Sequence, residues 1–263
     1  MQNKILKLVD ILPLIKYPLL TEKSYKLSDN RKSILKGYRN SVEFKTQQVN
    51  IDPYMIGYWL GDGTARDSVI TCQDSTVLYY FAHNLPQYDL YLTKRSSDYC
   101  YGISGFTCKV NSNIFLSTLK ELDLLNNKHI PHIYKCNSRE NRLKLLAGLI
   151  DSDGYYSRGM FEISQSEHHE KLIDDIIYLV RSLGFACYKK LKKTSLKYNG
   201  MKKHNKSWRI IISGNGIEEI PTKIPRKRAS PRKQKKDVLV TGIKVIPVGR
   251  DNYYGFTLDG NCR

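Results

Sequence analysis

Two short segments of this sequence end in an aspartate followed by glycine, each at the close of an apolar run. The first segment is Met55–Gly63, which reads MIGYWLGDG, and the second is Leu146–Gly154, which reads LAGLIDSDG. If each run is a helix, Asp62 and Asp153 lie at the two C-terminal ends. The glycine after each aspartate can then end its helix in the left-handed conformation.

A glycine also stands in the middle of each run, at Gly57 and Gly148. A mid-helix glycine costs about 1 kcal/mol relative to alanine, so a packing reason is expected. Without side chains there, the two helices can approach closely and bring Asp62 and Asp153 side by side. Adjacent carboxylates repel each other, and the negative ends of two helix dipoles add to the repulsion. A bound cation relieves it, and Mg²⁺ accepts carboxylate, water and phosphate oxygens together.

Metal ions held beside a phosphodiester generate hydroxide and stabilise developing charge, so this arrangement favours hydrolysis of a nucleic-acid backbone. One such motif alone is more simply an ordinary helix cap. Two copies 91 residues apart, followed by similar elements, instead indicate a tandem repeat.

After the first motif we expect a strand at 68–72, a helix at 75–84, strands at 89–95 and 99–110, and a helix at 113–122. After the second we expect a strand at 160–164, a helix at 167–183, and strands at 185–193 and 207–213.

The positive charge of the chain is concentrated in one region. The formal net charge is +18, and residues 186–236 hold seventeen Lys and Arg against two Glu. Such an excess favours a polyanionic partner, and nucleic acid neutralises it with release of counterions. For residues 226–236 alone, a solvated basic face or a nuclear-localisation tract is the alternative. An anionic membrane surface is disfavoured, because the basic residues alternate along strand-like segments.

The remaining composition favours a soluble intracellular protein, in the nucleus or the cytoplasm. With 263 residues and 41% hydrophobic content, the chain can bury a sizeable core. No membrane span or signal peptide is expected, because charged residues and a proline interrupt the apolar N-terminal stretch. The six cysteines show no zinc-like spacing and no CxxC pair, so reduced thiols are expected.

At these residues the sequence resembles the LAGLIDADG homing endonucleases, with Ser152 in place of alanine in the second signature. The resemblance implies an α+β fold of two pseudo-symmetric αββαββα halves, with saddle-shaped antiparallel sheets and the signature helices at their interface. It also implies a monomer that cleaves double-stranded DNA at a long asymmetric site with staggered ends. Asp62 and Asp153 would be catalytic metal ligands, each mainly responsible for one strand, with Gly61 and Ser152 completing the metal site. The cofactor would be Mg²⁺, for which Mn²⁺ can substitute.

The resemblance extends to a lysine block. Asn126–Pro131, NNKHIP, is similar to the block before the second signature in yeast vacuolar-ATPase-type intein endonucleases. It implies a catalytic role for Lys128, with Lys223 in Ile220–Pro225 as the counterpart in the second half. Lys227 is nearby and is the alternative, and a plain phosphate contact remains open for each lysine.

Strands with alternating long polar residues can lie in the major groove, where Arg reads guanine and Lys mostly contacts phosphates. This pattern predicts a set of contacts to double-stranded DNA in both halves. The predicted residues are Lys94, Arg95 and Lys109 in the first half, and Lys189, Lys190, Lys192, Lys193, Lys206, Arg209 and Lys227 in the second.

Both ends of the chain resemble pieces of an intein splicing domain. We expect a remnant or linker at 1–50, the two halves at 51–140 and 141–236, and a small β-rich, Hint-like remnant at 237–263. Residues 253–261, YYGFTLDGN, are similar to the block before an intein's C-terminal junction. The first residue is Met1 and no terminal His-Asn pair is found, so self-splicing is not expected. The alternatives to an active nuclease are a catalytically silent nucleic-acid-binding protein of the same fold, such as a maturase or regulator, and a fragment of a protein-splicing intein.

Overall fold

The computed structural model describes residues 36–107, 113–198, 201–231, 237 and 239–242. The chain forms two compact units, of which the larger is Arg39–Leu239. In the smaller unit, strand β1 (Lys36–Tyr38) pairs antiparallel with strand β9 (Val240–Gly242). Residues 39–50, which were expected to belong to the N-terminal remnant, fall in the larger unit. Residues 1–35 and 243–263 lie outside the described residues, so the assignment of splicing-domain remnants stays a prediction.

The first half of the larger unit is built around a three-stranded antiparallel sheet with the strand order β2-β4-β3. Its helices are α2 (Pro53–Asp62), α3 (Ser75–Asn84) and α4 (Ile114–Glu121), with a 3-10 turn at Leu85–Tyr88. Its strands are β2 (Val69–Thr71), β3 (Leu90–Lys94) and β4 (Cys100–Gly105). The first motif therefore lies on a helix, as predicted.

The second half has a four-stranded antiparallel sheet with the order β5-β6-β8-β7. Its strands are β5 (Gly154–Ser157), β6 (Met160–Ser166), β7 (Ala186–Tyr198) and β8 (Met201–Ser213). Its helices are α5 (His132–Lys135), α6 (Arg139–Asp153) and α7 (Glu170–Ser182), and 3-10 turns η2 (Ile217–Glu219) and η3 (Pro225–Lys227) follow.

The predicted α+β class is confirmed, with two differences from the αββαββα pattern. In the first half, the strand after the signature helix is reduced to one isolated bridge, Gly63 to Ile70. The counterpart of this bridge in the second half is the pair Gly154 and Ile163, which is the first residue pair of the β5–β6 ladder. Among the described residues, the second half ends in 3-10 turns where a helix was expected, and prolines in this segment disfavour a regular helix.

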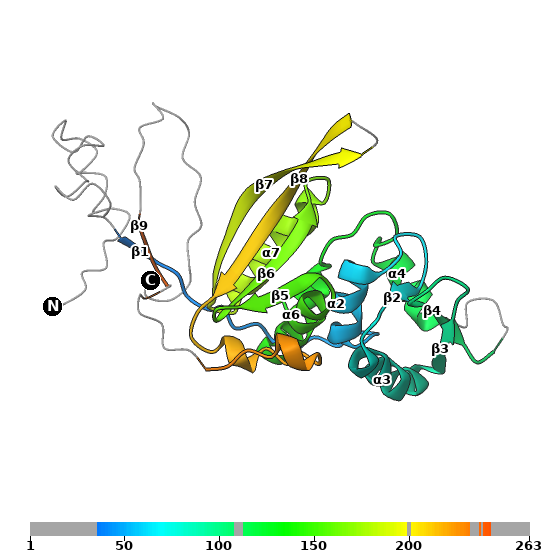
Figure 1. The fold of residues 1–263 in the computed structure, drawn as a ribbon. Coiled ribbons are helices and arrows are strands. Elements are labelled where there is room, and N and C mark those ends of the chain that lie inside the picture. Colours follow the sequence, from blue (N-terminus) through cyan, green and yellow to red (C-terminus); the bar gives the residue numbers. More distant parts are fainter. Residues whose placement is uncertain (1–35, 108–112, 199–200, 232–236, 238, 243–263) are drawn as a thin grey trace, which may run out of the picture. The chain divides into compact units, whose positions relative to one another are not determined.

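Helices α2 and α6 lie side by side between the two sheets (Figure 1). The residues of α2 from Pro53 to Leu60 are buried, so this helix is hydrophobic all round and needs partners on every side. The Asp52 side chain caps its start, with Oδ1 accepting hydrogen bonds from the Tyr54 and Met55 amides at 3.0 and 3.3 Å.

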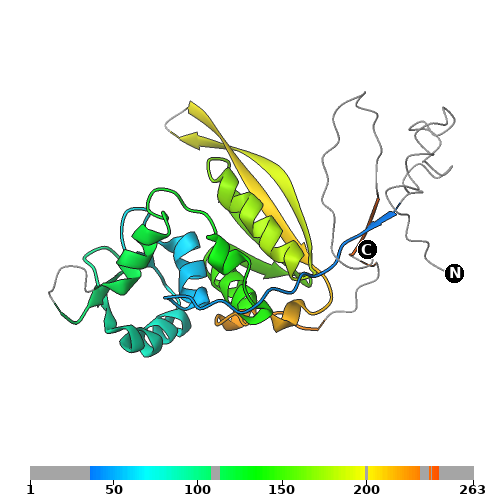
Figure 2. The same cartoon turned by 180° about the vertical axis from the view of Figure 1, so that it is seen from behind.

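Helix α7 covers one face of the second sheet, as seen from behind in Figure 2. It buries Leu172, Ile173 and Ile176 against that face. Along β6 and β8, alternate residues such as Ile163 and Ile210 are buried toward α7. The residues between them point to the opposite, exposed face of the sheet.

Candidate active site

The two signature helices touch at their glycines. A Cβ atom on Gly57 would lie 2.1 Å from the Leu145 carbonyl oxygen, and one on Gly148 would lie 2.1 Å from the Tyr54 carbonyl oxygen. At the C-terminal ends, a Cβ on Gly61 would lie 2.0 Å from Ser152 Oγ. The mid-helix glycines are therefore required by the close approach of two backbones, as their positions in sequence predicted.

The glycine that ends each signature helix was expected in the left-handed conformation, and this prediction is wrong. Gly63 has φ −82° and Gly154 has φ −90°, both extended. Glycine is still required there, because an added Cβ would lie 2.3 Å from the Trp59 carbonyl oxygen and 2.6 Å from that of Ile150, respectively. The chain thus passes directly from helix to strand while staying against the last helical turn.

Asp62 and Asp153 end these two helices close together, and a Cβ atom on Gly61 would lie 3.0 Å from Asp153 Oδ2. Burial, together with repulsion from Asp153, raises the pKa of Asp62 to about 6. Burial also raises the pKa of Asp153, and Lys128 acts in the opposite direction. Within the described residues, neither carboxylate forms a salt bridge. Two partly buried acids therefore share one polar site, as the motif spacing predicted.

Lys128 and Lys227 occupy related positions at the two helix ends. Lys128 Nζ donates to the carbonyl oxygens of Gly61 at 3.1 Å and Gly63 at 2.7 Å. Lys227 Nζ donates to three consecutive carbonyl oxygens at the end of α6, at 2.8 to 3.2 Å. Each ammonium group meets carbonyls left free at the negative end of a helix, where a cation is stabilised. Burial lowers the pKa of Lys128 to about 8 and lowers that of Lys227 as well.

Lys223, the residue chosen from sequence as the counterpart of Lys128, lies elsewhere. Its ammonium group stands over the rings of Tyr80, at 4.6 Å, and Tyr54, at 5.5 Å. Its backbone amide donates to Asp151 Oδ2 at 2.5 Å. The geometry therefore relates Lys227, and not Lys223, to Lys128. The sequence could not separate them because both stand in one short basic segment and only the 3-10 turn η3 decides which lysine reaches α6.

Sequence reasoning missed Gln165, whose side-chain amide donates to Asp153 Oδ2. Gln165 Oε1 in turn lies 3.1 Å from His169 Nδ1, so two side chains support this carboxylate. The corresponding position in the first half is Cys72, because it lies two residues beyond Ile70 as Gln165 lies two beyond Ile163. Only the strand register relates these two positions, because Cys72 lies nine residues after Gly63 whereas Gln165 lies eleven residues after Gly154. The two aspartates therefore have different neighbours.

The donor set at the helix ends fits a hard divalent cation. It consists of two carboxylates that repel each other, together with backbone carbonyl oxygens of Gly61 and Ser152 beside them. Among the described residues, no cluster of three or more His, Cys, Asp or Glu side chains suited to a metal ion is found. These few oxygens suit a hard divalent cation that also keeps waters and binds phosphate oxygens.

The basic residues predicted to contact DNA divide between the two faces of the second sheet. Lys189 points toward α7, where its Nζ lies 2.6 Å from Asp174 Oδ1. Lys206 lies 3.6 Å from Glu167 on that same face, and Lys193 is its cross-strand partner. The residues that alternate with them on the exposed face are Lys190, Lys192 and Arg209. The alternation of residues along a strand predicts that the sheet has two faces, but it does not predict which face packs against α7.

The first sheet makes a similar division. Lys94 pairs across the sheet with Tyr101, in the row that contains the buried Ile70. Arg95 has the opposite parity and its guanidinium lies over Gly102, where an added Cβ would be 2.6 Å from Arg95 Nε. Arg95 is thus on the exposed face, and Lys109 lies outside the described residues.

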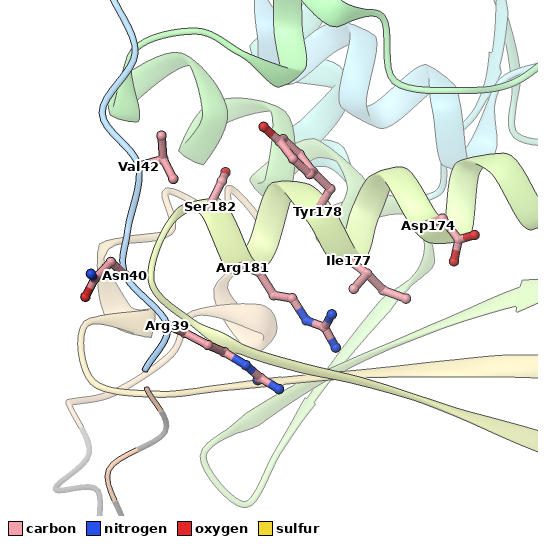
Figure 3. A pocket seen from close by; sticks show the side chains of 8 residues that line it. All are labelled: Arg39, Asn40, Val42, Asp174, Ile177, Tyr178, Arg181 and Ser182. Carbon is pink, nitrogen blue, oxygen red and sulfur yellow. The ribbon is translucent and has the colours of Figure 1, made fainter. Parts of the chain in front are cut away.

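A separate hollow of about 580 Å³ lies on the outer side of α7. Figure 3 shows its lining residues, which come from α7 and from the segment 39–42 that crosses its end. The buried Arg142 holds this segment in place by donating to the carbonyl oxygens of Val42, at 2.7 Å, and Ser182, at 3.0 Å. The hollow contains none of the residues at the helix ends.

In the described part of the chain, no helix has the length and apolar character needed to cross a membrane.

Paired glycine-packed helices that end in aspartates, each followed by an antiparallel sheet, define a two-half α+β protein. Residues 129–240 match the family model described as homing endonuclease. The chain is 27% identical over 166 residues to the homothallic switching endonuclease of Saccharomyces cerevisiae, covering 54% of this chain and 28% of that protein. It is 28% identical over 155 residues to the replicative DNA helicase DnaB of Mycobacterium intracellulare, covering 58% of this chain and 22% of that protein.

Among solved structures, variants of the homing endonuclease I-DmoI match with a TM-score of 0.40 and 14% identity, over 62% of this chain and 87% of that one. I-DmoI in complex with DNA and Ca matches with a TM-score of 0.38 and 13% identity, over 62% of this chain and 82% of that one. Residues 129–240 are thus similar to homing endonucleases. The chain spans between a fifth and a third of the length of the two curated relatives.

Proposed function

We propose that this chain is a site-specific endonuclease that hydrolyses double-stranded DNA with a divalent cation, Mg²⁺ or in its place Mn²⁺. The observation that carries the proposal is the pairing of Asp62 and Asp153 at the touching ends of two glycine-packed helices. The homing-endonuclease match and the name of the yeast relative support the same activity. We infer that the chain acts as a monomer, because two fused halves already supply both aspartates.

The chemistry of the site follows from its charges. When bound, the divalent cation would be held by Asp62 and Asp153 together with the Gly61 and Ser152 carbonyl oxygens, and it would lower the pKa of a water and stabilise charge on the phosphate. The aspartates would hold that cation beside the scissile phosphates, each mainly for one strand. Two nearby active positions on opposite strands would leave staggered ends.

Lys128 and Lys227 contribute positive charge beside the reacting phosphates. Their ammonium groups lie at the ends of α2 and α6, beside the two aspartates that would hold the cation. An ammonium placed where charge develops stabilises the transition state more than the ground state. We therefore assign the second lysine role to Lys227 in place of Lys223.

DNA would lie against the exposed faces of both sheets, which carry Arg95 in the first half and Lys190, Lys192 and Arg209 in the second. Because the two halves differ in sequence, the recognised site would be long and asymmetric. Phosphate contacts from the lysines would make binding depend strongly on salt concentration.

The proposal is tested by incubating the protein with a randomised duplex-DNA library in Mg²⁺ and sequencing the ends produced. One defined staggered cut supports it. Salt-sensitive binding without cleavage in either Mg²⁺ or Mn²⁺ would instead identify a catalytically silent DNA-binding protein of the same fold.

A further inference from the structure

The exposed face of the second sheet carries an acid among its basic residues. Glu162 of β6 lies beside Arg209 of β8, with Glu162 Oε1 3.0 Å from Arg209 Nε. Glu162 is paired in register with Ile211, and Arg209 with Ser164, so the two charged residues are diagonal neighbours. About a third of each side chain remains exposed, at 33% and 37%.

The surroundings of Glu162 suit contact with bases. Its row across the sheet runs from Tyr155 through Ile211 to Tyr188, and the two tyrosines are 67% and 50% exposed. A hollow of about 290 Å³ opens here, lined by Tyr155, Ser157, Arg158, Met160, Phe161, Glu162 and Ile211. A carboxylate, aromatic rings and an aliphatic side chain thus share one accessible recess.

Stability does not explain the acid. A partly exposed ion pair on a sheet surface contributes little to folding, because water and salt screen it. On a surface that faces DNA, a carboxylate is repelled by phosphates, so its presence needs a compensating contact. A base edge that carries an amino group provides one: Glu accepts a hydrogen bond from cytosine N4, and Arg donates two to guanine O6 and N7.

We infer that Glu162 and Arg209 form a base-reading pair that recognises an adjacent cytosine and guanine in the major groove of the half-site bound by the second sheet. This inference rests on the proposed function, since it requires DNA on the exposed face. Arg209 offsets the charge of Glu162 and limits its repulsion by the backbone. Lys190, the cross-strand neighbour of Arg209, would contact phosphate and carry no base preference.

The test uses the cleavage site selected from the library and every single-base substitution of it. Cleavage and equilibrium binding are measured for the wild type, Glu162→Gln and Arg209→Gln. We expect each variant to lose about tenfold to hundredfold discrimination at one of two adjacent base pairs, with preferences elsewhere unchanged. Lys190→Gln should weaken binding to all sequences alike and reduce the salt slope by about 1.

Matched controls come from the other face of the same sheet. Lys189 of β7 and Asp174 of α7 form an ion pair there, and Lys189→Gln and Asp174→Asn should leave every base preference unchanged. Thermal unfolding of all variants verifies that they fold.

Two outcomes separate this inference from the proposed function. If the wild type cuts one site and both Glu162→Gln and Arg209→Gln keep its full base preferences, the base-reading pair is wrong and the nuclease remains. If the wild type neither binds nor cuts any duplex in the library, both proposals fall.

Discussion

Replacing Gly148 with alanine tests the close packing that creates the active site. The added Cβ would lie 2.1 Å from the Tyr54 carbonyl oxygen and 2.6 Å from the Tyr58 amide nitrogen, both backbone atoms. Ordinary contacts are 3.4 Å or more, so the helices must separate by roughly 1 Å. Overpacking costs about 1–3 kcal/mol, and because both overlapping atoms belong to the backbone the cost here lies near the upper end, at about 2–3 kcal/mol. The intrinsic helix preference of alanine, about 1 kcal/mol, offsets only part of that cost.

We expect Gly148→Ala to lower the free energy of unfolding by about 1–2 kcal/mol, measured by denaturant titration, and to lower the melting temperature by a few degrees. Cleavage should fall on the order of 100-fold, because a 1 Å displacement of a reacting group has that effect. Ser152→Ala is the control at this interface. It removes only a hydroxyl that bonds within its own helix, to the Gly148 and Leu149 carbonyl oxygens, and should change stability by less than about 1 kcal/mol. A Gly148→Ala protein as stable as the wild type, or more stable, would refute the reasoning.

Three further predictions concern the groups around the aspartates. In chelator, the contribution of Asp62 to stability should fall as pH rises from about 4 to about 6, because its raised pKa means that the folded state holds the proton longer than the unfolded state. The difference in the free energy of unfolding between the wild type and Asp62→Asn, measured across this pH range, should show that fall. Lys227→Met should reduce the cleavage rate by at least tenfold more than Lys223→Met in single-turnover assays, and equal losses would contradict the assignment of Lys227. Gln165→Ala should slow cleavage of one strand more than the other, whereas Cys72→Ala should spare that strand, as strand-labelled gels will reveal.

The sequence predicted the elements that follow a strong local pattern. The helix expected at 75–84 is present with those bounds, and that expected at 113–122 is present as Ile114–Glu121. Strand β5 was missed, because Gly154–Ser157 is only four residues long and follows the helix without a turn. Strands β7 and β8 are longer than expected. They pair with each other along their whole length, and this pairing extends them beyond the residues whose local propensity indicates a strand.

The sequence predicted those residues of the site that belong to the repeated signature. Gly57, Gly148 and the two aspartates are recognisable from spacing alone. The roles of Lys227 and Gln165 were not, because they depend on where a 3-10 turn and a strand end meet α6 in space. Long-range contacts of this kind are set by tertiary packing, which a single sequence does not display.

The most direct test of the central claim follows each DNA strand separately on the selected site. The site is labelled on either strand and incubated in Mg²⁺ with the wild type, Asp62→Asn and Asp153→Asn, after DNA binding by each protein has been verified. The account predicts that the wild type cuts both strands, while each variant binds DNA normally and loses double-strand cleavage. Unchanged cleavage of both strands by either variant would contradict the claim that the two aspartates form the catalytic site.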